Sequence, residues 1–214
     1  MTYSDITFNA PGLGFSFDLV IAQQIVEWAV TNEPPHPPAV LKKLGLIYCI
    51  KQRGYTRFVE TGTYLGDTAG VMAANGCRVF TIELSERLYE RACELFANSD
   101  LVTCIHGDSA VRLSEVVDLL DGPALFWLDG HYSGPTTAMG GEVSPVIGEL
   151  ACLGRARQAR AELIDRSTIH IDDLHCFGDD GYPTLDALHT AVRANLPRHI
   201  VKTVNNTLRI EPGP

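Results

Sequence analysis

The sequence predicts an α/β fold built on a doubly wound, mostly parallel sheet of seven strands. From Tyr55 onward, five short apolar runs alternate with stretches of helical periodicity, the pattern of parallel strands joined by crossover helices. The last stretch, residues 199–212, holds two alternating runs about Asn205-Asn206, which predicts an antiparallel hairpin at one edge of the sheet. A chain of 214 residues with 45% hydrophobic and 20% charged residues is long enough to bury one such core.

Composition narrows the classes of partner. The chain carries 17 Lys+Arg against 26 Asp+Glu, a formal net charge of −9, and has no basic run, so we expect neither nucleic acid nor a membrane surface as a partner. The N-terminal residues lack the pattern of a secretory signal, and no stretch approaches the roughly 20 apolar residues of a membrane span. We therefore expect a cytoplasmic protein with a small-molecule substrate, and leave a homodimer open. The 6 cysteines are scattered singly and are expected to be free thiols.

Residues 1–54 are expected to form a helical extension ahead of one globular unit, residues 55–214. Helical spacing is found over residues 15–30 and again over 40–54, where it ends at Gly54. Between them, residues 33–39 contain four prolines, which favour an extended spacer over a helix. The first helix is thus free to move relative to the rest, and we interpret the extension as a lid.

The globular unit is predicted element by element from its apolar runs and turn residues. Strands are predicted over residues 56–62, 78–84, 100–109, 124–131 and 167–173, followed by the terminal hairpin. Helices are predicted over residues 67–76, 85–98, 114–120, 142–163 and 182–196. Ser85 is a candidate N-cap, and Pro145 suits the first turn of the long fourth helix.

Acidic residues follow all five predicted strands. An open parallel sheet binds ligands at the carboxyl ends of its strands, and the acids at these ends are Glu60, Glu83, Asp108, Asp129 and Asp172. The first belongs to a glycine turn, residues 60–66, that opens a helix and lets a ligand approach the backbone. Glu83 comes 21 residues after Gly62, where a carboxylate can accept both hydroxyls of a ribose. Together they favour a nucleoside ligand, although each alone is more often a plain loop residue.

The ordered set Glu60–Gly66 (ETGTYLG), Ile82-Glu83, Gly107-Asp108-Ser109 and Leu128-Asp129-Gly130 resembles the class I S-adenosylmethionine-dependent methyltransferases from Tyr55 to the C-terminus. The resemblance implies a Rossmann-like methyltransferase fold with S-adenosylmethionine as cofactor. It also implies a methionine-binding loop, a ribose acceptor and an adenine contact. The methionine-binding role falls on Glu60, Thr61, Gly62, Thr63 and Gly66, the ribose role on Glu83, and the adenine role on Asp108 and Ser109. Asp129 is included as a further cofactor contact.

The loop departs from the family pattern at two positions. Glu60 stands where Asp is common, and Tyr64 takes the place of a frequent glycine. A nicotinamide enzyme would need G-x-G-x-x-G, which the loop lacks, so an NAD-dependent or nucleotide-sugar enzyme is the second reading. An inactive cofactor-binding module is the third. For Asp108 taken alone, capping of the next turn is the simpler interpretation.

Asp129, Asp172 and Asp173 are candidate metal ligands. Neighbouring strands lie about 4.8 Å apart, so their strand-end carboxylates crowd one end of the sheet and call for a cation. Oxygen ligands suit Mg²⁺ or another hard divalent ion, and the pattern resembles metal-dependent O-methyltransferases of catechols and of macrolide or aminocoumarin sugars. With His131 and His175 nearby in sequence, Fe²⁺ or Zn²⁺ is an alternative. The plainer interpretation is that the three acids cap turns.

Methyl transfer to a hydroxyl requires that its proton be removed. His131, two residues beyond Asp129 in a glycine-flanked turn, is the candidate base, with Asp129 beside it in the catalytic set. His175 is the substitute candidate. The expected activity is a metal-assisted O-methylation of a small diol-bearing molecule, and the substrate itself is not encoded in a readable motif.

Overall fold

The computed structural model describes residues 7–9, 16–31, 36–130, 144–179 and 181–214, with side chains from Val20 onward. Its main sheet contains β3 (Arg57–Thr61), β4 (Arg78–Glu83), β5 (Val102–His106), β6 (Leu125–Leu128), β7 (Thr168–Ile171), β8 (His199–Val204) and β9 (Thr207–Pro212). The helices around it are α2 (Ala39–Arg53), α3 (Asp67–Ala74), α4 (Glu86–Leu95), α5 (Ser109–Leu119), α6 (Val146–Ala159), α7 (Ala161–Asp165) and α8 (Leu185–Asn195).

The sheet confirms the predicted fold class. Its strand order is β5-β4-β3-β6-β7-β9-β8, in which the first five are parallel and β9 runs antiparallel to both β7 and β8. The chain moves outward from β3 to β5, returns to place β6 on the other side of β3, and continues to β7. The order therefore reverses between β3 and β6, the point at which open α/β sheets bind their ligands.

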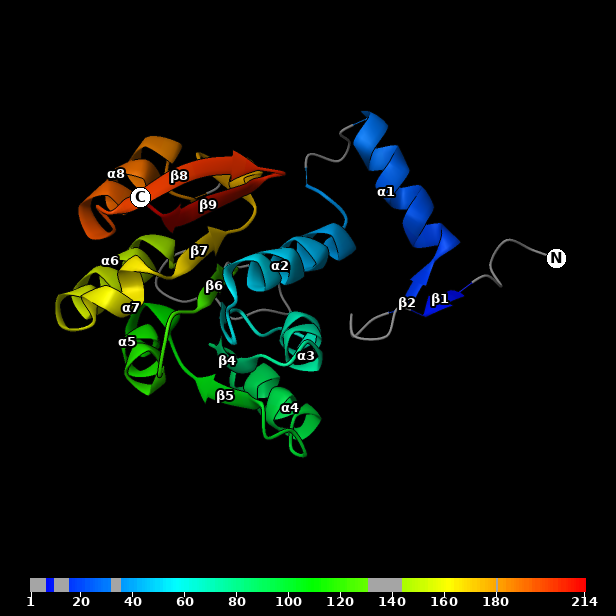
Figure 1. Ribbon diagram of the computed structural model, residues 1–214, viewed down its shortest axis with the longest axis horizontal. Helices are drawn as coiled ribbons and strands as arrows, with labels where there is room; N and C mark the ends of the chain where they lie inside the picture. The colour runs from blue at the N-terminus through cyan, green and yellow to red at the C-terminus, as the bar shows by residue number, and fades with distance from the viewer. Residues whose placement is uncertain (1–6, 10–15, 32–35, 131–143, 180) are drawn as a thin grey trace.

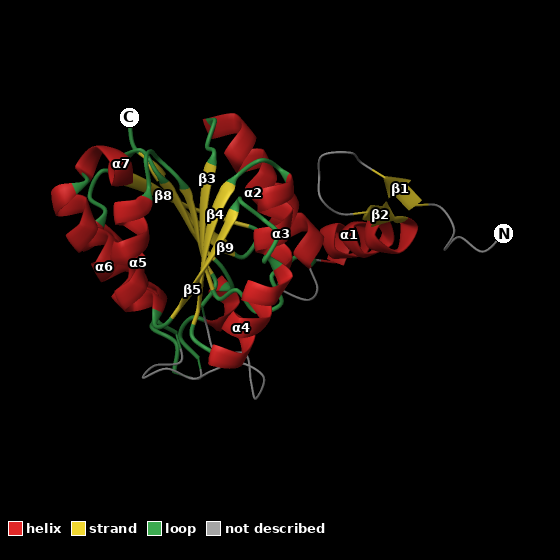
Figure 2. Cartoon of the chain, turned by 90° about the horizontal axis from the view of Figure 1, so that it is seen from below, coloured by secondary structure: helices red, strands yellow, loops and turns green. Residues whose placement is uncertain are grey.

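Helices cover both faces of the sheet, as Figure 2 shows edge-on with α5 and α6 on one side and α2, α3 and α4 on the other. Side chains alternate between these layers along each strand. In β6, Phe126 and Leu128 pack toward the first layer, whereas Leu125 and Trp127 pack toward α2 and α3. This double burial explains why the strands read as continuous apolar runs rather than as alternating ones.

The N-terminal segment differs from the predicted helix over residues 15–30. Ser16–Asp18 forms β2, which pairs antiparallel with β1, Thr7–Asn9, so α1 begins only at Leu19 and ends at Thr31. In Figure 1, α1 and this strand pair extend away from the sheet and its helices. By contrast, α2 buries Leu46 and Ile50 against the sheet. Gly54 ends α2 in the left-handed conformation, as its place in the sequence predicted.

Two other helix boundaries correct the sequence prediction. The helix predicted over residues 142–163 is divided at Arg160, which leaves helical dihedrals (φ −126°, ψ 44°) and donates hydrogen bonds to the carbonyls of Leu120 and Val117. The helix predicted over 114–120 begins earlier, at Ser109, because Asp108 caps it through a bond from Ala110 N to Oδ1 of 2.9 Å. Within the described ranges, none of the helices is long and apolar enough to span a membrane.

Candidate functional site

The predicted site residues lie at the carboxyl ends of β3 to β7, on both sides of the point where the strand order reverses. Glu60 and Thr61 end β3, Glu83 ends β4, and Asp108 follows β5. Asp129 follows β6, and Asp172 with Asp173 follows β7. His131 lies outside the described residues.

Gly62 brings the glycine loop against the end of β6. Its φ is +81°, and a Cβ at this position would lie 2.6 Å from the carbonyl oxygen of Asp129. Its N–H donates to the carbonyl of Ile82 at 2.9 Å, which holds the loop on β4 as well. Only glycine fits both the positive φ and the close approach to the Asp129 carbonyl. The glycine at this position therefore allows the loop to lie directly against Asp129.

Tyr64 has a positive φ of 49° although it is not glycine. Its N–H donates to Oε2 of Glu83 at 2.9 Å, which helps to hold this less favourable conformation. Tyr64 therefore adopts the left-handed backbone region that glycine favours.

Glu83 is buried and hydrogen-bonded to backbone at both carboxylate oxygens. Oε2 accepts from Tyr64 N, and Oε1 accepts from Ser85 N at 2.9 Å. Each ionised oxygen can accept more than one hydrogen bond, so acceptor capacity for a ribose hydroxyl remains. The carboxylate thus connects the glycine loop with the start of α4, whose N-cap is Ser85 as predicted.

Glu60 is a buried acid beside this loop. Thr81 Oγ1 donates to its Oε2 at 2.9 Å, and the hydroxyls of Thr81 and Thr63 lie 2.6 Å apart. Burial raises the pKa of Glu60 to about 8, with Thr81 opposing the shift and the charges of Asp129 and Glu83 adding to it. At neutral pH its carboxyl is therefore mostly protonated and offers a hydrogen-bond donor to this part of the site.

Glu149 is a site residue that the sequence reasoning missed. It lies in the first turn of α6, is buried, and accepts a hydrogen bond of 2.6 Å from Ser109 Oγ. Burial raises the pKa of Glu149 to about 7, opposed by hydrogen bonds from Ser109 and Thr61. The signal was present in the sequence, because a lone Glu shares the apolar face of the helix with Val146 and Leu150.

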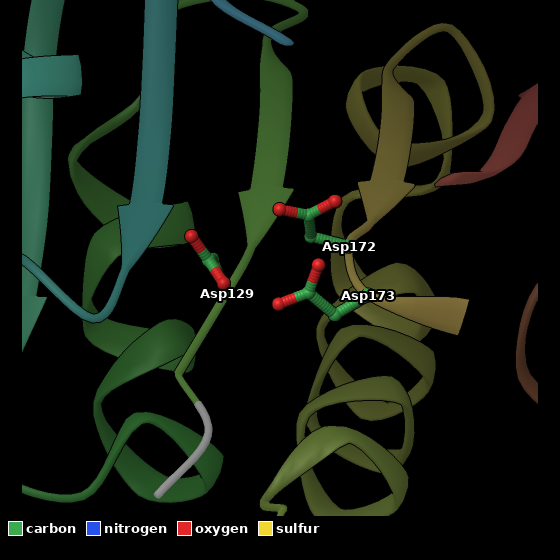
Figure 3. A group of neighbouring side chains, drawn as sticks. All are labelled: Asp129, Asp172 and Asp173. Carbon is green, nitrogen blue, oxygen red and sulfur yellow. The ribbon is translucent and has the colours of Figure 1, made fainter. Parts of the chain in front are cut away.

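The three predicted metal ligands lie together at the ends of β6 and β7. Asp129, Asp172 and Asp173 each offer a carboxylate oxygen, and these oxygens all lie within 4.8 Å of one another (Figure 3). Burial, followed by the charge of Asp129, raises the pKa of Asp172 to about 7 even though Lys42 opposes the shift. We call these three residues the carboxylate cluster. Three oxygen donors of this kind fit a hard divalent cation.

Lys42, from the first turn of α2, reaches the carboxylate cluster and was not predicted. Its Nζ lies 2.5 Å from Oδ2 of Asp172 and 2.8 Å from Oδ1 of Asp173. Burial acts to lower the pKa of Lys42, but the two aspartates outweigh it and the pKa is raised. The ammonium is therefore a charged counter-ion to the cluster.

The hairpin turn at Asn206 fixes the loop after β7. Asn206 Oδ1 accepts from His175 N at 2.8 Å, and its Nδ2 donates to His175 Nδ1 at 2.9 Å. Since that amide is a donor, Nδ1 of His175 is the acceptor, and the neutral ring carries its hydrogen on Nε2. The next residue, Thr207, donates to Oδ1 of Asp172 at 3.5 Å. The Nδ1 lone pair of His175 is thus engaged by Asn206.

Comparison of the sequence with protein-family models and with curated proteins finds no match. Similar solved structures include a Podospora anserina methyltransferase bound to S-adenosylhomocysteine (SAH). It is 18% identical, with a TM-score of 0.57 over 88% of this chain and 86% of that chain. An O-methyltransferase from Bacillus cereus in complex with SAH is 17% identical, with a TM-score of 0.57 over 91% of each chain. A putative caffeoyl-CoA O-methyltransferase from Staphylococcus aureus is 14% identical, with a TM-score of 0.53 over 88% and 91% of the two chains.

These likenesses agree with the strand order, in which five parallel strands are completed by an antiparallel pair at one edge. At identities below one fifth they establish the fold and leave the activity to chemical argument. The resemblance that the sequence motifs predicted is confirmed at this level: the protein has the α/β methyltransferase fold.

Proposed function

We propose that the protein is an S-adenosylmethionine-dependent O-methyltransferase acting on a small hydroxylated molecule, with a divalent cation at the carboxylate cluster. The observation that carries the proposal is the contact between Gly62 and the backbone of Asp129. This contact supports the proposal because the glycine loop proposed to bind a nucleoside lies against Asp129, one of the three proposed metal ligands. A methyl donor and a metal-held acceptor oxygen need this adjacency, because transfer is in line and over a short distance.

On the cofactor side, Glu83 would accept the ribose hydroxyls while keeping its bonds to Tyr64 and Ser85. Asp108 is partly committed to capping α5, and Ser109 donates its hydroxyl to Glu149. The adenine contact that the sequence assigned to these two residues would therefore involve the second oxygen of Asp108 and the backbone of the loop.

On the acceptor side, the cofactor would supply an electrophilic methyl group, and the cation would lower the pKa of a bound hydroxyl. Asp129, Asp172 and Asp173 would hold that cation, and His131 remains the proposed proton acceptor. The similar solved structures of an O-methyltransferase from Bacillus cereus and a putative caffeoyl-CoA O-methyltransferase from Staphylococcus aureus support a hydroxyl acceptor by analogy. Vicinal diol groups, on a sugar, a phenolic ring or another small molecule, are the acceptors that a single ion chelates through two oxygens.

The test is SAH binding by calorimetry, with NAD as the competing ligand. SAH should bind and raise the melting temperature, because a ligand bound only by the native state stabilises it. Glu83→Gln should weaken SAH binding at least tenfold, since the ribose hydroxyls lose a charged carboxylate oxygen as hydrogen-bond acceptor. Glu86→Gln, at an exposed position in the next helix, is the matched control and should bind SAH as the native protein does. Binding of NAD in preference to SAH would overturn the proposal and favour the dinucleotide enzyme.

A further inference from the structure

An ammonium group already occupies two members of the carboxylate cluster. Lys42 Nζ contacts Asp172 Oδ2 and Asp173 Oδ1, and the other oxygen of Asp172 accepts from Thr207. A divalent cation that used the same oxygens would meet a positive charge at hydrogen-bond distance in a poorly hydrated place, where repulsion is only weakly screened. The ammonium and the cation therefore cannot both hold these positions.

Lys42 belongs to a segment that touches the site at two points. The first turn of α2 carries Lys42, and six residues earlier the ring of His36 lies 5.5 Å from that of His175, centroid to centroid. The buried anchors of α2, Leu46, Ile47 and Ile50, are all in its later turns. The start of this segment thus contacts the site through Lys42 and the ring of His36, with Pro37 buried between them, whereas the later turns of the helix are held by the core.

We propose that Lys42 is an intramolecular competitor of the divalent cation, so that metal binding displaces its ammonium and releases the start of α2 from the carboxylate cluster. The inference rests on the metal site of the proposed function and adds to it a coupling between the metal and the N-terminal segment. A bound cation takes the place of the single positive charge of the Lys42 ammonium. The segment from His36 to Lys42 then loses its link to Asp172 and Asp173. Reciprocity requires that a protein without this ammonium bind the cation more tightly.

The first experiment measures Mn²⁺ affinity of the full-length protein by the electron paramagnetic resonance signal of free Mn²⁺, with SAH present throughout. Lys42→Met should bind Mn²⁺ at least tenfold more tightly than the native protein. Lys43→Met is the matched control, because Lys43 Nζ lies 3.8 Å from Asp67 Oδ2 rather than at the carboxylate cluster, and the Mn²⁺ affinity of this variant should stay within twofold of the native value. Asp172→Asn should weaken Mn²⁺ binding, which locates the ion.

The second experiment uses the native protein and therefore does not depend on whether Lys42→Met folds. Hydrogen exchange of the amides in residues 39–45 should speed up at least threefold when Mn²⁺ is added, whereas exchange in the later turns of α2 should not change. Unchanged exchange over residues 39–45 with Mn²⁺ bound, or equal Mn²⁺ affinity in Lys42→Met, would overturn the competition. If no variant binds Mn²⁺ but SAH still binds, the metal site and this inference fall together and the methyltransferase assignment stands.

Discussion

Gly62 combines two demands that can be separated by mutation. Its φ of +81° disfavours any side chain, and a Cβ would meet the Asp129 carbonyl oxygen at 2.6 Å. Gly76, at the end of α3, has nearly the same φ of +82°, but no heavy atom of the described residues lies within 4 Å of its Cβ position. The two positions therefore share the backbone cost and differ in the steric one.

We expect Gly76→Ala to lower the free energy of unfolding by about 1–2 kcal/mol, the cost of a left-handed L-residue. Gly62→Ala should cost roughly 3 kcal/mol or more, because a backbone oxygen must also move. Denaturant unfolding measures both values, and SAH affinity should fall only in Gly62→Ala. Equal losses in the two variants would mean that the loop yields to the methyl group without disturbing Asp129.

At single positions, the sequence predicted the acids better than their partners. Asp129, Asp172 and Asp173 were placed together because strand ends meet at one edge of a sheet. Lys42 was not, because it precedes Asp172 by 130 residues, and a lysine on an amphipathic helix carries no sign of where its ammonium goes. Asp108 shows the reverse case, since the simpler interpretation as a helix cap describes its observed bond.

At the level of elements, α1 is the part least supported by the rest of the protein. From Val20 to Thr31 none of its residues is buried, and Val30 is 80% exposed. Its strongest contacts in the described chain are with β2, and Figure 1 shows both lying apart from the sheet. A helix with so little burial contributes little to the stability of the domain.

Deletion of residues 1–31 should therefore leave the melting temperature within about 2 °C of the native value, because none of the described side chains of α1, from Val20 to Thr31, is buried. SAH affinity should also be unchanged, since the residues proposed to bind the cofactor begin at Glu60, in β3. Differential scanning calorimetry and titration with SAH measure the two quantities. A fall of more than about 5 °C would show that α1 packs against the domain in solution.

Element boundaries were predicted less well than element types. Periodicity placed the strands and most helices correctly, because the hydrophobic pattern is a local property of the chain. It could not separate Ser16–Asp18 from the helix that follows, since a three-residue strand exists only through its pairing with Thr7–Asn9. It also joined α6 to α7, because the bonds that turn the chain at Arg160 go to carbonyls some 40 residues away.

For the molecule as a whole, buried acids make stability depend on pH. Glu60 has a pKa of about 8 and Glu149 about 7, both raised from 4.5 chiefly by burial. Between the unfolded and folded pKa values, the native state holds protons that the unfolded state has released. Raising the pH through this window therefore lowers the free energy of unfolding. The net charge of −9 acts in the same direction through self-repulsion.

The melting temperature should accordingly fall steadily as the pH rises from 5.5 to 8.5. For Glu60 alone the change is on the order of 4 kcal/mol, the free energy of a shift of this size in one buried carboxyl. Glu60→Gln removes that titration and should make the profile shallower while the titration of Glu149 remains, whereas Glu86→Gln, at an exposed carboxyl, should reproduce the native profile. A Glu60→Gln profile as steep as the native one would show that Glu60 does not titrate over this range in the folded protein.

The turn at Asn206 also determines when, during synthesis of the chain, the loop after β7 can reach its final structure. Asn206 orients His175, and Thr207 bonds to Asp172, so the loop after β7 is complete only when the hairpin of β8 and β9 has been added. On the ribosome, the glycine loop and Asp129 emerge long before this hairpin does. A nascent or prematurely terminated chain ending before Asn206 would then carry the glycine loop and Asp129 without the bonds that fix His175 and Asp172.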